Sequence, residues 1–347
     1  MKKKWEDSPM MRAARCQKTT SVPVWLMRQA GRYMPEYRKV RENVSFIELC
    51  KTPDLAAEVM LTAVQRLGVD AAIIFSDILL ILEPMGFELV FEPDGGPNIS
   101  NPIRNSSAVK LVRELESVEP LEFVMNTIRY TREGLDDSLP LIGFAGAPFT
   151  LAAYAIEGSS SRNFRQVKAF MHIYPNEWQE LMQKFAISTA RYLNSQIDAG
   201  VQIVQLFDSW VGCLSDEDYK KYVKPYSRML IDLIVPGTPI IHFAPGNPVL
   251  LTDIRDAGGH VIGIDWRVTV KRAWEMIGSN YAIQGNLDPA MLLTNRDLIR
   301  QAVLHILRQV ERRPGFIFNL GHGIMPQTPV ENAIALVEAV HEFGTVR

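Results

Sequence analysis

The sequence lacks the residue groupings that mark disulfide-rich and metal-binding proteins. It has only three cysteines among 347 residues, and no two of them form a C-x-x-C pair. Scattered cysteines fit a reducing compartment and argue against a disulfide framework or a thiolate zinc cluster. The six histidines are also dispersed, and "HFA" at 242–244 offers His242 no second ligand beside it. We therefore expect no metal site.

The sequence also lacks an export signal and a membrane span. Its first residues, "MKKKWEDSPM", are basic but are not followed by the apolar segment of a signal peptide. No run approaches the roughly 18 consecutive apolar residues that a transmembrane helix needs. These absences predict a soluble protein of the cytoplasm.

Nucleotide cofactors have no support either. There is no G-x-G-x-x-G after a predicted strand and no G-x-x-x-x-G-K-[ST]. No lysine ends an apolar strand in the manner of a Schiff-base lysine. The remaining functional groups are carboxylate, imidazole, hydroxyl and guanidinium, a set that suits acid–base chemistry and recognition of an anionic substrate.

Positive charge is concentrated near the N-terminus although the net charge is only −2. Residues 1–41 contain eleven Lys or Arg against three acids. Such an arm is compatible with nucleic-acid binding and equally with a solvated tail. The lysines of 2–4 favour the tail, and we expect residues 1–18 to form a poorly ordered basic arm.

The arginines further along the chain have a different setting. In "MRQAGRYMPEYR" (27–38) glycine, proline and aromatic residues interrupt the charges. Arginine fits carboxylates with two parallel hydrogen bonds, and glycine allows close approach of the backbone to a ligand. The pattern thus indicates an anion site, and the alternative is a surface cluster that makes ordinary ion pairs.

The chain otherwise alternates helical patterns with short, continuous apolar runs. This alternation is typical of parallel strands that are buried on both faces. The seven predicted strands lie within 70–77, 139–148, 201–209, 239–246, 260–266, 281–288 and 315–323. Their number favours a single (β/α)₈ TIM-type barrel over an open doubly wound sheet.

Two further segments complete this predicted architecture. An eighth strand is either absent, distorted or supplied by "VPVWLM" (22–27), a choice that the sequence leaves open. The segment 87–99 alternates polar and apolar residues and contains Gly-Gly, which predicts a β-hairpin inserted after the first clear strand. No Pro/Gly/Ser-rich linker divides the chain, so we expect one domain over residues 1–347.

Polar residues gather at or just after the carboxyl ends of the predicted strands. A single residue of this kind is often no more than a helix N-cap, and that reading stays open for Asp208, Ser209 and Asp288. In a barrel the strand ends converge on one face, so the whole set predicts one polar cavity there. The set comprises Asp77, Asp208, Ser209, His242, Asp265, Asn286, Asp288 and His322.

Several of these segments resemble one known family. "PVWLMRQAGRYMPEYR" (23–38) resembles the N-terminal signature of the uroporphyrinogen decarboxylases. Later blocks of that family are resembled, in order, by "AAIIFSDIL", "LIGFAGAPFTLAAYAIEG", "QLFDSW", "IGIDW", "QGNLDP" and "NLGHG". The resemblance extends from about residue 12 to about residue 343, and its two longest blocks make a chance match very improbable.

This resemblance implies an enzyme that converts the four acetate side chains of uroporphyrinogen III to methyl groups. The product would be coproporphyrinogen III, with no metal or organic cofactor, and the enzyme would be a homodimer. By motif, the implied catalytic residues are Asp77, Arg28, Tyr154 and His322. The implied substrate-binding residues are Arg28, Gln29, Ala30, Gly31, Arg32, Arg41, Phe46, Asp77, Tyr154, Phe207, Ser209 and His322.

The implied mechanism uses the substrate's pyrrole ring as an electron sink. Asp77 would accept hydrogen bonds from pyrrole N–H groups and stabilise positive charge on the ring. The donor of the first proton stays open between an arginine and a substrate carboxyl, and the high pKa of arginine favours a supporting role for Arg28. Tyr154 and His322 retain the alternative of packing in the core, as His242 does.

Two other functions compete with this interpretation. Zinc- and corrinoid-linked methyltransferases are similar to this family, but they use a His-x-Cys pair and a later cysteine, which "HFA" and "NLGHG" lack. A non-catalytic tetrapyrrole carrier would not need Asp77. Nucleic-acid binding by the N-terminal arm is disfavoured because no aromatic residues interleave its lysines.

Overall fold

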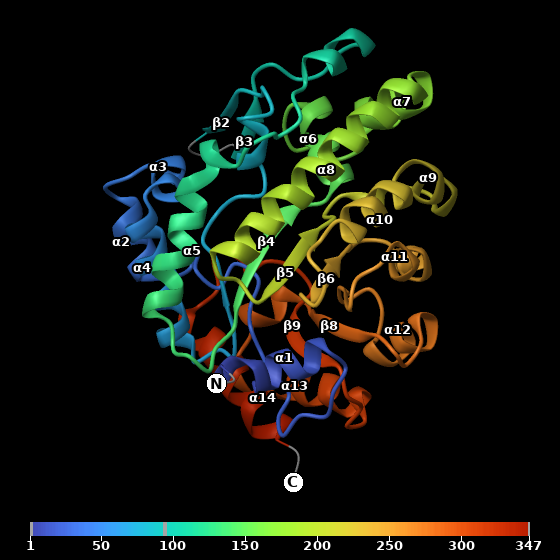
Figure 1. Cartoon of the computed structure of the whole chain (residues 1–347). Coiled ribbons are helices and arrows are strands. Elements are labelled where there is room, and N and C mark those ends of the chain that lie inside the picture. The colour runs from blue at the N-terminus through green and yellow to red at the C-terminus, as the bar shows by residue number, and fades with distance from the viewer. Residues whose placement is uncertain (1–2, 93–95, 346–347) are drawn as a thin grey trace.

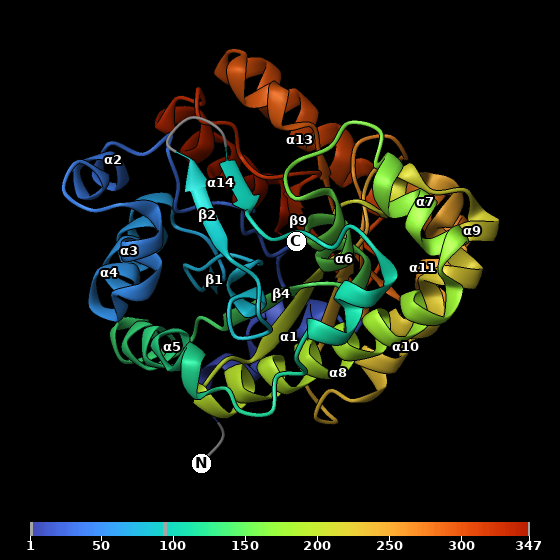
Figure 2. The ribbon, with the colours of Figure 1, turned by 90° about the horizontal axis from the view of Figure 1, so that it is seen from above.

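The computed structural model describes residues 3–92 and 96–345, and its centre is a curled parallel sheet of seven strands (Figures 1 and 2). Each strand pairs in parallel with the next along the chain. The strands are β1 (Ala72–Ile73), β4 (Leu141–Gly146), β5 (Ile203–Phe207), β6 (Ile240–Phe243), β7 (Val261–Gly263), β8 (Ala282–Leu287) and β9 (Phe316–Leu320). All seven predicted strands are confirmed, and so is the α/β barrel class.

The gap between β9 and β1 is occupied by residues 23–25. The amide of Phe318 donates to the Pro23 carbonyl at 2.8 Å, and Val24 forms a parallel bridge with Phe318. On the other side, the Asp70 amide donates to the Val24 carbonyl at 2.8 Å, just before β1 begins. The segment 22–27 therefore takes the eighth place of a distorted barrel.

Helices surround the sheet, as the view from above shows (Figure 2). The helices that follow or precede the strands turn their apolar side inward, because a buried parallel sheet needs cover on its outer face. The Pro53 ring suits the first turn of α4, and Gly68, at φ 68°, ends it in the left-handed conformation. The main outer helices are α4 (Pro53–Leu67), α5 (Glu122–Gly134), α8 (Pro175–Ala199), α10 (Lys224–Asp232), α11 (Leu251–Ala257), α12 (Val270–Ile277), α13 (Arg296–Val310) and α14 (Val330–Gly344).

Shorter helices lie between these elements and extend the ends of the barrel. They are α1 (Pro9–Ala14), α2 (Pro35–Arg41), α3 (Phe46–Lys51), α6 (Pro148–Glu157), α7 (Arg165–Ile173) and α9 (Asp216–Tyr222). None of the helices in the described part of the chain combines the length and apolarity that a bilayer crossing requires.

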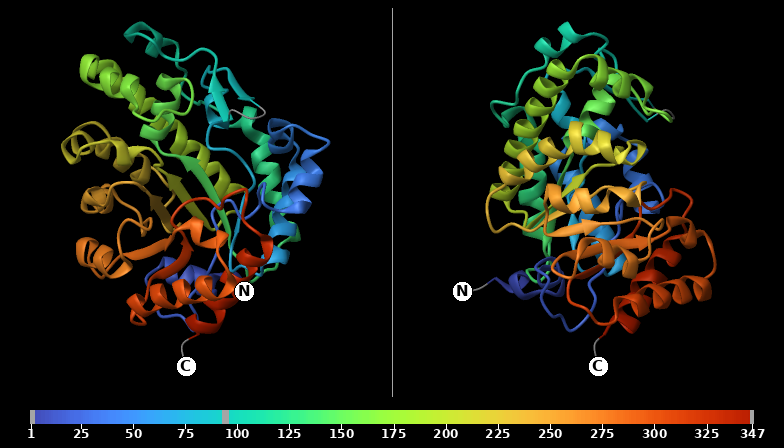
Figure 3. Two further views of the ribbon diagram at one scale, coloured as in Figure 1. Left: turned by 180° about the vertical axis from the view of Figure 1, so that it is seen from behind. Right: turned by 90° about the vertical axis from the view of Figure 1, so that its right-hand side faces the viewer.

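The predicted β-hairpin is confirmed as strands β2 (Leu89–Glu92) and β3 (Gly96–Ile99), which pair antiparallel. Its turn lies outside the described residues. The Ile99 amide donates to the Gly158 carbonyl at 2.6 Å, which ties the hairpin to the end of α6. Both views of Figure 3 place the hairpin at the end of the barrel opposite α1.

The expectation of a poorly ordered arm over residues 1–18 is wrong for the residues that the structure describes. Ser8 caps α1 by accepting a hydrogen bond from the Met11 amide at 3.3 Å. Met10 and Met11 are fully buried, and α1 packs against β9. The sequence prediction gave weight to the basic charges and overlooked a short amphipathic helix. Burial of its two large apolar side chains stabilises this helix.

The interior of the barrel contains a chain of buried side-chain hydrogen bonds. The Trp25 indole donates to Gln284 at 2.9 Å, and the Gln284 amide donates to Gln205 at 2.9 Å. All three side chains are buried. Because buried polar groups are costly unless they are paired, this chain fixes the position of the 22–27 segment relative to β5 and β8.

Candidate active site

Arg28 lies in a turn that adjoins the carboxyl ends of the strands. Its φ of 64° is in the left-handed region, which is uncommon for a residue with a side chain. The Met27 amide donates to Asn319 Oδ1 at 3.0 Å, and the Met27 carbonyl accepts from Ile324 at 2.9 Å. These two bonds hold the turn against the end of β9 and the residue that follows the "NLGHG" segment (319–323).

The glycine that ends "NLGHG" makes room for the arginine. A Cβ atom on Gly323 would fall 2.5 Å from Cδ of Arg28, so any larger residue would displace the arginine side chain. The positive charge of Arg28 is close enough to act on the pKa values of Asp77, Tyr154 and His322. The structure thus brings together the four residues that the resemblance implied as catalytic.

Gln29 has a different place from the one expected of a substrate-binding side chain. It is fully buried, accepts from the Leu26 amide at 3.1 Å and donates to the Ala71 carbonyl at 3.2 Å. Its side chain therefore fixes the arginine turn from inside. Ala30 is buried beside it, and a Cβ on Gly31 would lie 3.0 Å from the Arg28 carbonyl, which explains the small residues here.

Arg32 and Arg41 extend the positive charge away from Arg28. Arg32 is exposed, and in the described parts of the chain its guanidinium has no hydrogen-bond or ion-pair partner. Its carbonyl accepts from Arg38 Nη1 at 3.0 Å, which orders the segment. Arg41 is half-buried and donates to the Val44 carbonyl. Among the described residues, Arg32 is thus available to an external anion, whereas Arg41 is partly engaged.

Asp77 follows β1 and lies within the cluster. Its Oδ1 accepts a hydrogen bond from the Leu79 amide at 2.9 Å. Burial raises the pKa of its carboxyl, while the bond from Leu79 and the charge of Arg28 oppose that rise. No described group donates to Oδ2, so a ligand that brings hydrogen-bond donors or positive charge would favour the ionised form.

Tyr154 and His322 are held in their neutral forms. Burial, together with the charge of Asp77, raises the pKa of Tyr154 to about 12, so its hydroxyl stays a hydrogen-bond donor. Part of the His322 side chain is exposed to solvent. The protein around the rest of the ring removes water from it, and this desolvation, together with the charge of Arg28, lowers the pKa of His322. Near pH 7 the site therefore offers a neutral phenol and a neutral imidazole beside a fixed guanidinium.

Aromatic side chains form two walls near these polar groups. On one side, the Phe46 ring from α3 lies 6.1 Å from Phe75 and 4.9 Å from Phe91 of the hairpin. On the other, the Phe207 ring lies 5.5 Å from Phe144 and 6.0 Å from Phe243. The predicted apolar contacts Phe46 and Phe207 are both half-buried, as expected for walls that a ligand would cover.

The second wall continues through the residues after β5. The Trp210 ring lies 5.9 Å from Tyr154 and 5.2 Å from Phe164, and Ser209 is half-buried beside it. Trp210 thus contacts a predicted catalytic residue although the sequence assigned it no role. Its position directly after "FDS" was the signal available.

The remaining strand-end residues are mostly bound to other parts of the protein. Asp265 accepts from the Gly246 amide at 2.7 Å and from Arg267 at 2.6 Å. Asn286 donates to the carbonyls of Asp265 and Val268, and Asp288 caps the helical turn after β8. These residues fix the conformation of the loops around the site. Fewer strand-end side chains are therefore free to contact a ligand than the sequence analysis predicted.

Arg267 and Trp266 are residues that sequence reasoning missed. Arg267 lies over the Trp266 ring at 4.7 Å, and its charge adds to the lowering of the His322 pKa. Trp266 is 40% exposed. The sequence feature that could have revealed both residues is their position directly after "IGID". There β7 ends at the same end of the barrel as Asp77.

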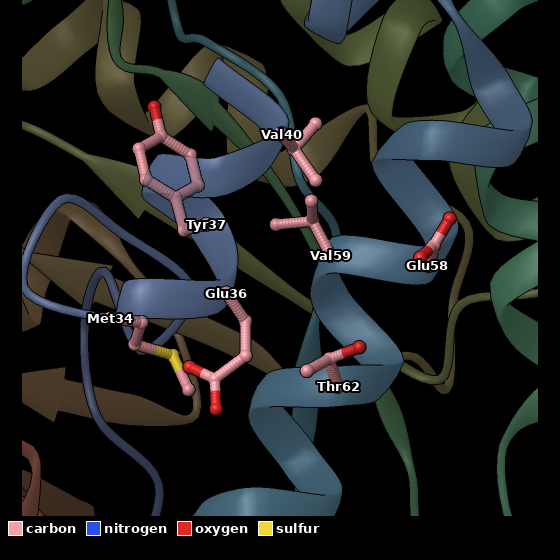
Figure 4. A pocket seen from close by; sticks show the side chains of 7 residues that line it. All are labelled: Met34, Glu36, Tyr37, Val40, Glu58, Val59 and Thr62. Carbon is pink, nitrogen blue, oxygen red and sulfur yellow. The ribbon is translucent and has the colours of Figure 1, made fainter. Parts of the chain in front are cut away.

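One pocket lies apart from this site. A small pocket between α2 and α4 is lined by Met34, Glu36, Tyr37, Val40, Glu58, Val59 and Thr62 (Figure 4). Val40 and Val59 face each other across it, and it contains none of the residues described above. Within residues 3–92 and 96–345, no three His, Cys, Asp or Glu side chains are grouped so that they could hold a metal ion.

Comparisons with known proteins show the family of the chain. The family model of uroporphyrinogen decarboxylase (URO-D) matches residues 6–343. The chain belongs to the uroporphyrinogen decarboxylase family. It is 53% identical over 341 residues to a uroporphyrinogen decarboxylase of Carboxydothermus hydrogenoformans, covering 98% of this chain and 97% of the relative. A uroporphyrinogen decarboxylase of Syntrophotalea carbinolica is 49% identical, with 97% and 98% covered.

Two solved structures that carry other names share the barrel fold. A methyltransferase from Methanosarcina mazei superposes with a TM-score of 0.79 at 22% identity, covering 97% of this chain and 99% of that one. A putative vitamin-B12-independent methionine synthase from Listeria monocytogenes gives a TM-score of 0.58 at 11% identity, with 94% and 97% covered. At these identities the likeness concerns the fold alone.

Proposed function

We propose that the chain removes CO₂ from the four acetate side chains of uroporphyrinogen III and releases coproporphyrinogen III in tetrapyrrole biosynthesis. Membership of the uroporphyrinogen decarboxylase family makes it a carboxy-lyase. The proposal includes a reaction that needs neither a metal nor an organic cofactor. It also assigns the individual roles below to residues of the cluster around Asp77.

The observation that supports the proposal best is the free Oδ2 of Asp77 inside a desolvated cluster. A pyrrole N–H of the substrate would donate to this oxygen, and a protonated pyrrole ring would place positive charge beside it. Loss of CO₂ then leaves electrons that the cationic ring accepts, and protonation of the resulting carbon gives the methyl group. A preorganised charge of this kind is worth roughly 10²–10³ in rate in other enzymes.

Arg28 and Arg32 have the role of binding the carboxylates of the substrate. Uroporphyrinogen III carries eight carboxylates, and a guanidinium fits each with two parallel hydrogen bonds. Arg28 is held by its turn and by the space over Gly323, whereas Arg32 is exposed with no described partner. We therefore assign Arg28 to an acetate near the reacting ring and Arg32 to a side chain further out.

Tyr154 and His322 act as neutral polar groups in this scheme. The raised pKa of Tyr154, about 12, keeps its hydroxyl protonated so that it can donate to a substrate carboxylate or to Asp77. The lowered pKa of His322 keeps its ring neutral near pH 7, so it adds no second positive charge beside the cationic intermediate. Phe46, Phe207 and Ser209 would contact the faces and edges of the macrocycle.

A metal-dependent methyl transfer is the second candidate because the Methanosarcina mazei methyltransferase shares the fold. The absence of grouped ligands in the described residues does not favour it. A carrier without catalysis would not explain a desolvated carboxylate with an unused oxygen. The free Oδ2 of Asp77 therefore favours the decarboxylase over both.

The proposal is tested by incubating the purified chain with uroporphyrinogen III under reducing conditions after treatment with a chelator. We expect the stepwise appearance of hepta-, hexa-, penta- and tetracarboxylated products, with no change on adding zinc. The folded variant Asp77→Asn serves as the control. A chain that binds the substrate but releases no CO₂ would be a carrier, and activity that depends on added metal would overturn the cofactor assignment.

The assembly, location and domain organisation belong to the same proposal. We propose a cytoplasmic homodimer whose chain forms one domain over 1–347. Exposed Val249, Trp266 and Leu293 follow the adjacent strands β6, β7 and β8 and supply apolar area for an interface at that rim. Light scattering on the purified chain tests the dimer, and recovery of two stable proteolytic fragments would contradict the single domain.

A further inference from the structure

Asp208 and His242 form a buried pair that the mechanism above does not use. Asp208 directly follows β5, and His242 lies within the neighbouring β6. Both side chains are fully buried, and Asp208 Oδ2 lies 3.6 Å from His242 Nε2. Across the described residues, neither atom has a hydrogen-bond partner.

The other ring nitrogen of His242 limits where its proton can be. His242 Nδ1 lies 3.3 Å from the Gly258 carbonyl, which can only accept a hydrogen bond. Nδ1 must therefore carry a proton. In a neutral ring, Nε2 would then present a lone pair to the Asp208 carboxylate, and both groups would be buried acceptors without a donor.

Among the described residues, His242 is the only basic side chain within ion-pair distance of the Asp208 carboxylate. Its Oδ1 accepts from the Thr150 hydroxyl at 3.4 Å. Two titratable groups of the neighbouring elements are Cys213 and Tyr219. Burial raises the pKa of Cys213 to about 11 and that of Tyr219 well above its usual range, and Asp208 adds to both shifts. Both stay neutral. The charges of Lys168 and Glu157 act on Cys213 with opposite signs, but in the described part of the chain only His242 lies within ion-pair distance of Asp208.

We infer that His242 is an imidazolium paired with an ionised Asp208, and that this buried pair positions the Phe207–Trp210 wall of the active site. Successive residues of a strand point to opposite sides. Asp208 is accordingly fully buried against α6 on one side of the chain, whereas Phe207 and Ser209 lie on the other side and are half-buried. The attraction between the two buried charges fixes which way this segment faces.

The pair joins the elements that carry the wall. The Asp208 amide donates to the Phe243 carbonyl on β6 at 2.8 Å, and the Ala147 amide before α6 donates to the Phe207 carbonyl at 3.0 Å. Through Thr150, Asp208 also contacts α6, the helix that bears Tyr154. Asp208 and His242 are therefore positioning residues, and their effect on turnover rests on the roles proposed above for Tyr154 and Ser209.

Two substitutions of His242 by side chains of similar length distinguish the effect of a hydrogen-bond donor from the effect of packing. His242→Gln keeps an amide that can donate to Asp208, whereas His242→Met fills the same space without a donor. We expect His242→Gln to keep a melting temperature and kcat close to those of the wild type. His242→Met should lower the melting temperature and reduce kcat by roughly 10–100-fold, because a displaced wall misplaces the groups it supports.

A double variant tests whether the loss comes from an unpaired charge. In Asp208→Leu/His242→Met both partners are apolar, so we expect it to melt higher than His242→Met alone, since no buried carboxylate is left without a partner. Equal melting temperatures and equal kcat for His242→Gln and His242→Met would overturn the pairing. So would a double variant that is no more stable than His242→Met.

The protonation state itself is measured by ¹⁵N NMR of histidine-labelled wild-type protein, with the His242 signals assigned by their loss in His242→Gln. We expect both ring nitrogens to be protonated at pH 7. A neutral ring with one protonated nitrogen would overturn the inference. Because the spectrum and the melting temperatures need no substrate, they remain decisive even if the chain fails to decarboxylate uroporphyrinogen.

Discussion

The two ends of the barrel differ in how Asp70 and Asp77, the carboxylates that flank β1, are paired. At the end where the strands begin, charged groups meet partners: His341 of α14 lies 3.0 Å from Asp70, which also accepts from the Val24 amide at 2.8 Å. At the end where the strands finish, Arg28 has a φ of 64° and the described structure leaves Asp77 Oδ2 without a donor. Asp70 and His341 are paired in the free protein, whereas we propose that a ligand completes the group around Asp77.

This difference separates stability from activity in the molecule. The start of the strands is covered by α1, with Met10 and Met11 fully buried and Cys16 against Gly315 just before β9. The opposite end keeps a desolvated carboxylate and a strained arginine, which cost free energy in the free protein. Barrel enzymes in general place their sites at this end and their stabilising contacts at the other.

Removing the charge of Asp77 should have the largest effect, and on activity alone. In Asp77→Asn we expect kcat to fall by roughly 10²–10³, because one preorganised charge is lost at the cationic ring. Burial raises the Asp77 pKa, so the ionised group is unfavourable in the free protein and the variant should melt no lower than the wild type. Product formation and thermal melts measure both.

Asp198→Asn is the matched control for this variant. Asp198 is exposed near the end of α8, at the end of the barrel where the strands begin. Its replacement should change neither kcat nor the melting temperature. A folded Asp77→Asn enzyme with wild-type kcat would remove Asp77 from the mechanism and would break the division between the two ends.

Truncating Met11 should give the reverse result. Met11→Ala removes a buried side chain of α1, so we expect the free energy of unfolding to fall by about 2–3 kcal/mol, within the range for such core truncations. The values of kcat and KM should stay close to those of the wild type below the melting transition. Met11→Leu, which conserves volume, is the control, and a kcat loss in Met11→Ala without destabilisation would contradict the comparison.

Removing Arg32 should have a smaller effect on substrate binding. In Arg32→Ala we expect KM for uroporphyrinogen to rise about tenfold with little change in kcat, because one charge-assisted contact in a partly exposed position is lost. The rise should shrink at high salt. Arg272→Ala, at an exposed position on α12, is the control. An unchanged KM in Arg32→Ala would exclude this arginine from the site.

The smallest expected effect is a pH dependence of stability at the start of the strands. The hydrogen bond to Asp70 raises the pKa of His341 above its usual value of about 6.5. The stabilisation is therefore complete below pH 6.5 and is lost as the pH rises through the raised folded value. Because the His341 side chain is 41% exposed, solvent screening limits it to less than about 1 kcal/mol.

Denaturant unfolding of the wild type and His341→Gln between pH 5 and pH 9 measures this contribution, at pH values chosen across the range in which histidine titrates. The two curves should converge at high pH. Asp70→Asn keeps an acceptor for the Val24 amide but removes the charge, so it should flatten the pH dependence in the same way. If the difference in stability between the wild type and His341→Gln increased with pH, the His341–Asp70 pair would not be the cause.

Local patterns predicted most of the fold because each strand is a continuous apolar run between helices. They also predicted Asp77, Arg28, Tyr154 and His322 through the family resemblance, and the structure brings these four together. They failed for residues 3–18, where the positive charge concealed the buried methionines of α1. They also assigned Gln29 to the substrate, whereas its side chain bonds to Leu26 and Ala71 in the core.

The sequence by itself determined the order of elements, the family and the residue types at the strand ends, since these depend on local periodicity and on contiguous motifs. Only the tertiary structure decided that residues 23–25 fill the eighth place of the barrel, because that place is defined by hydrogen bonds to β9 and to Asp70. It also decided that Asp208 faces His242 and that Arg28 lies over Gly323. These contacts join residues 34 and 295 positions apart, a separation at which no sequence pattern specifies distance or direction.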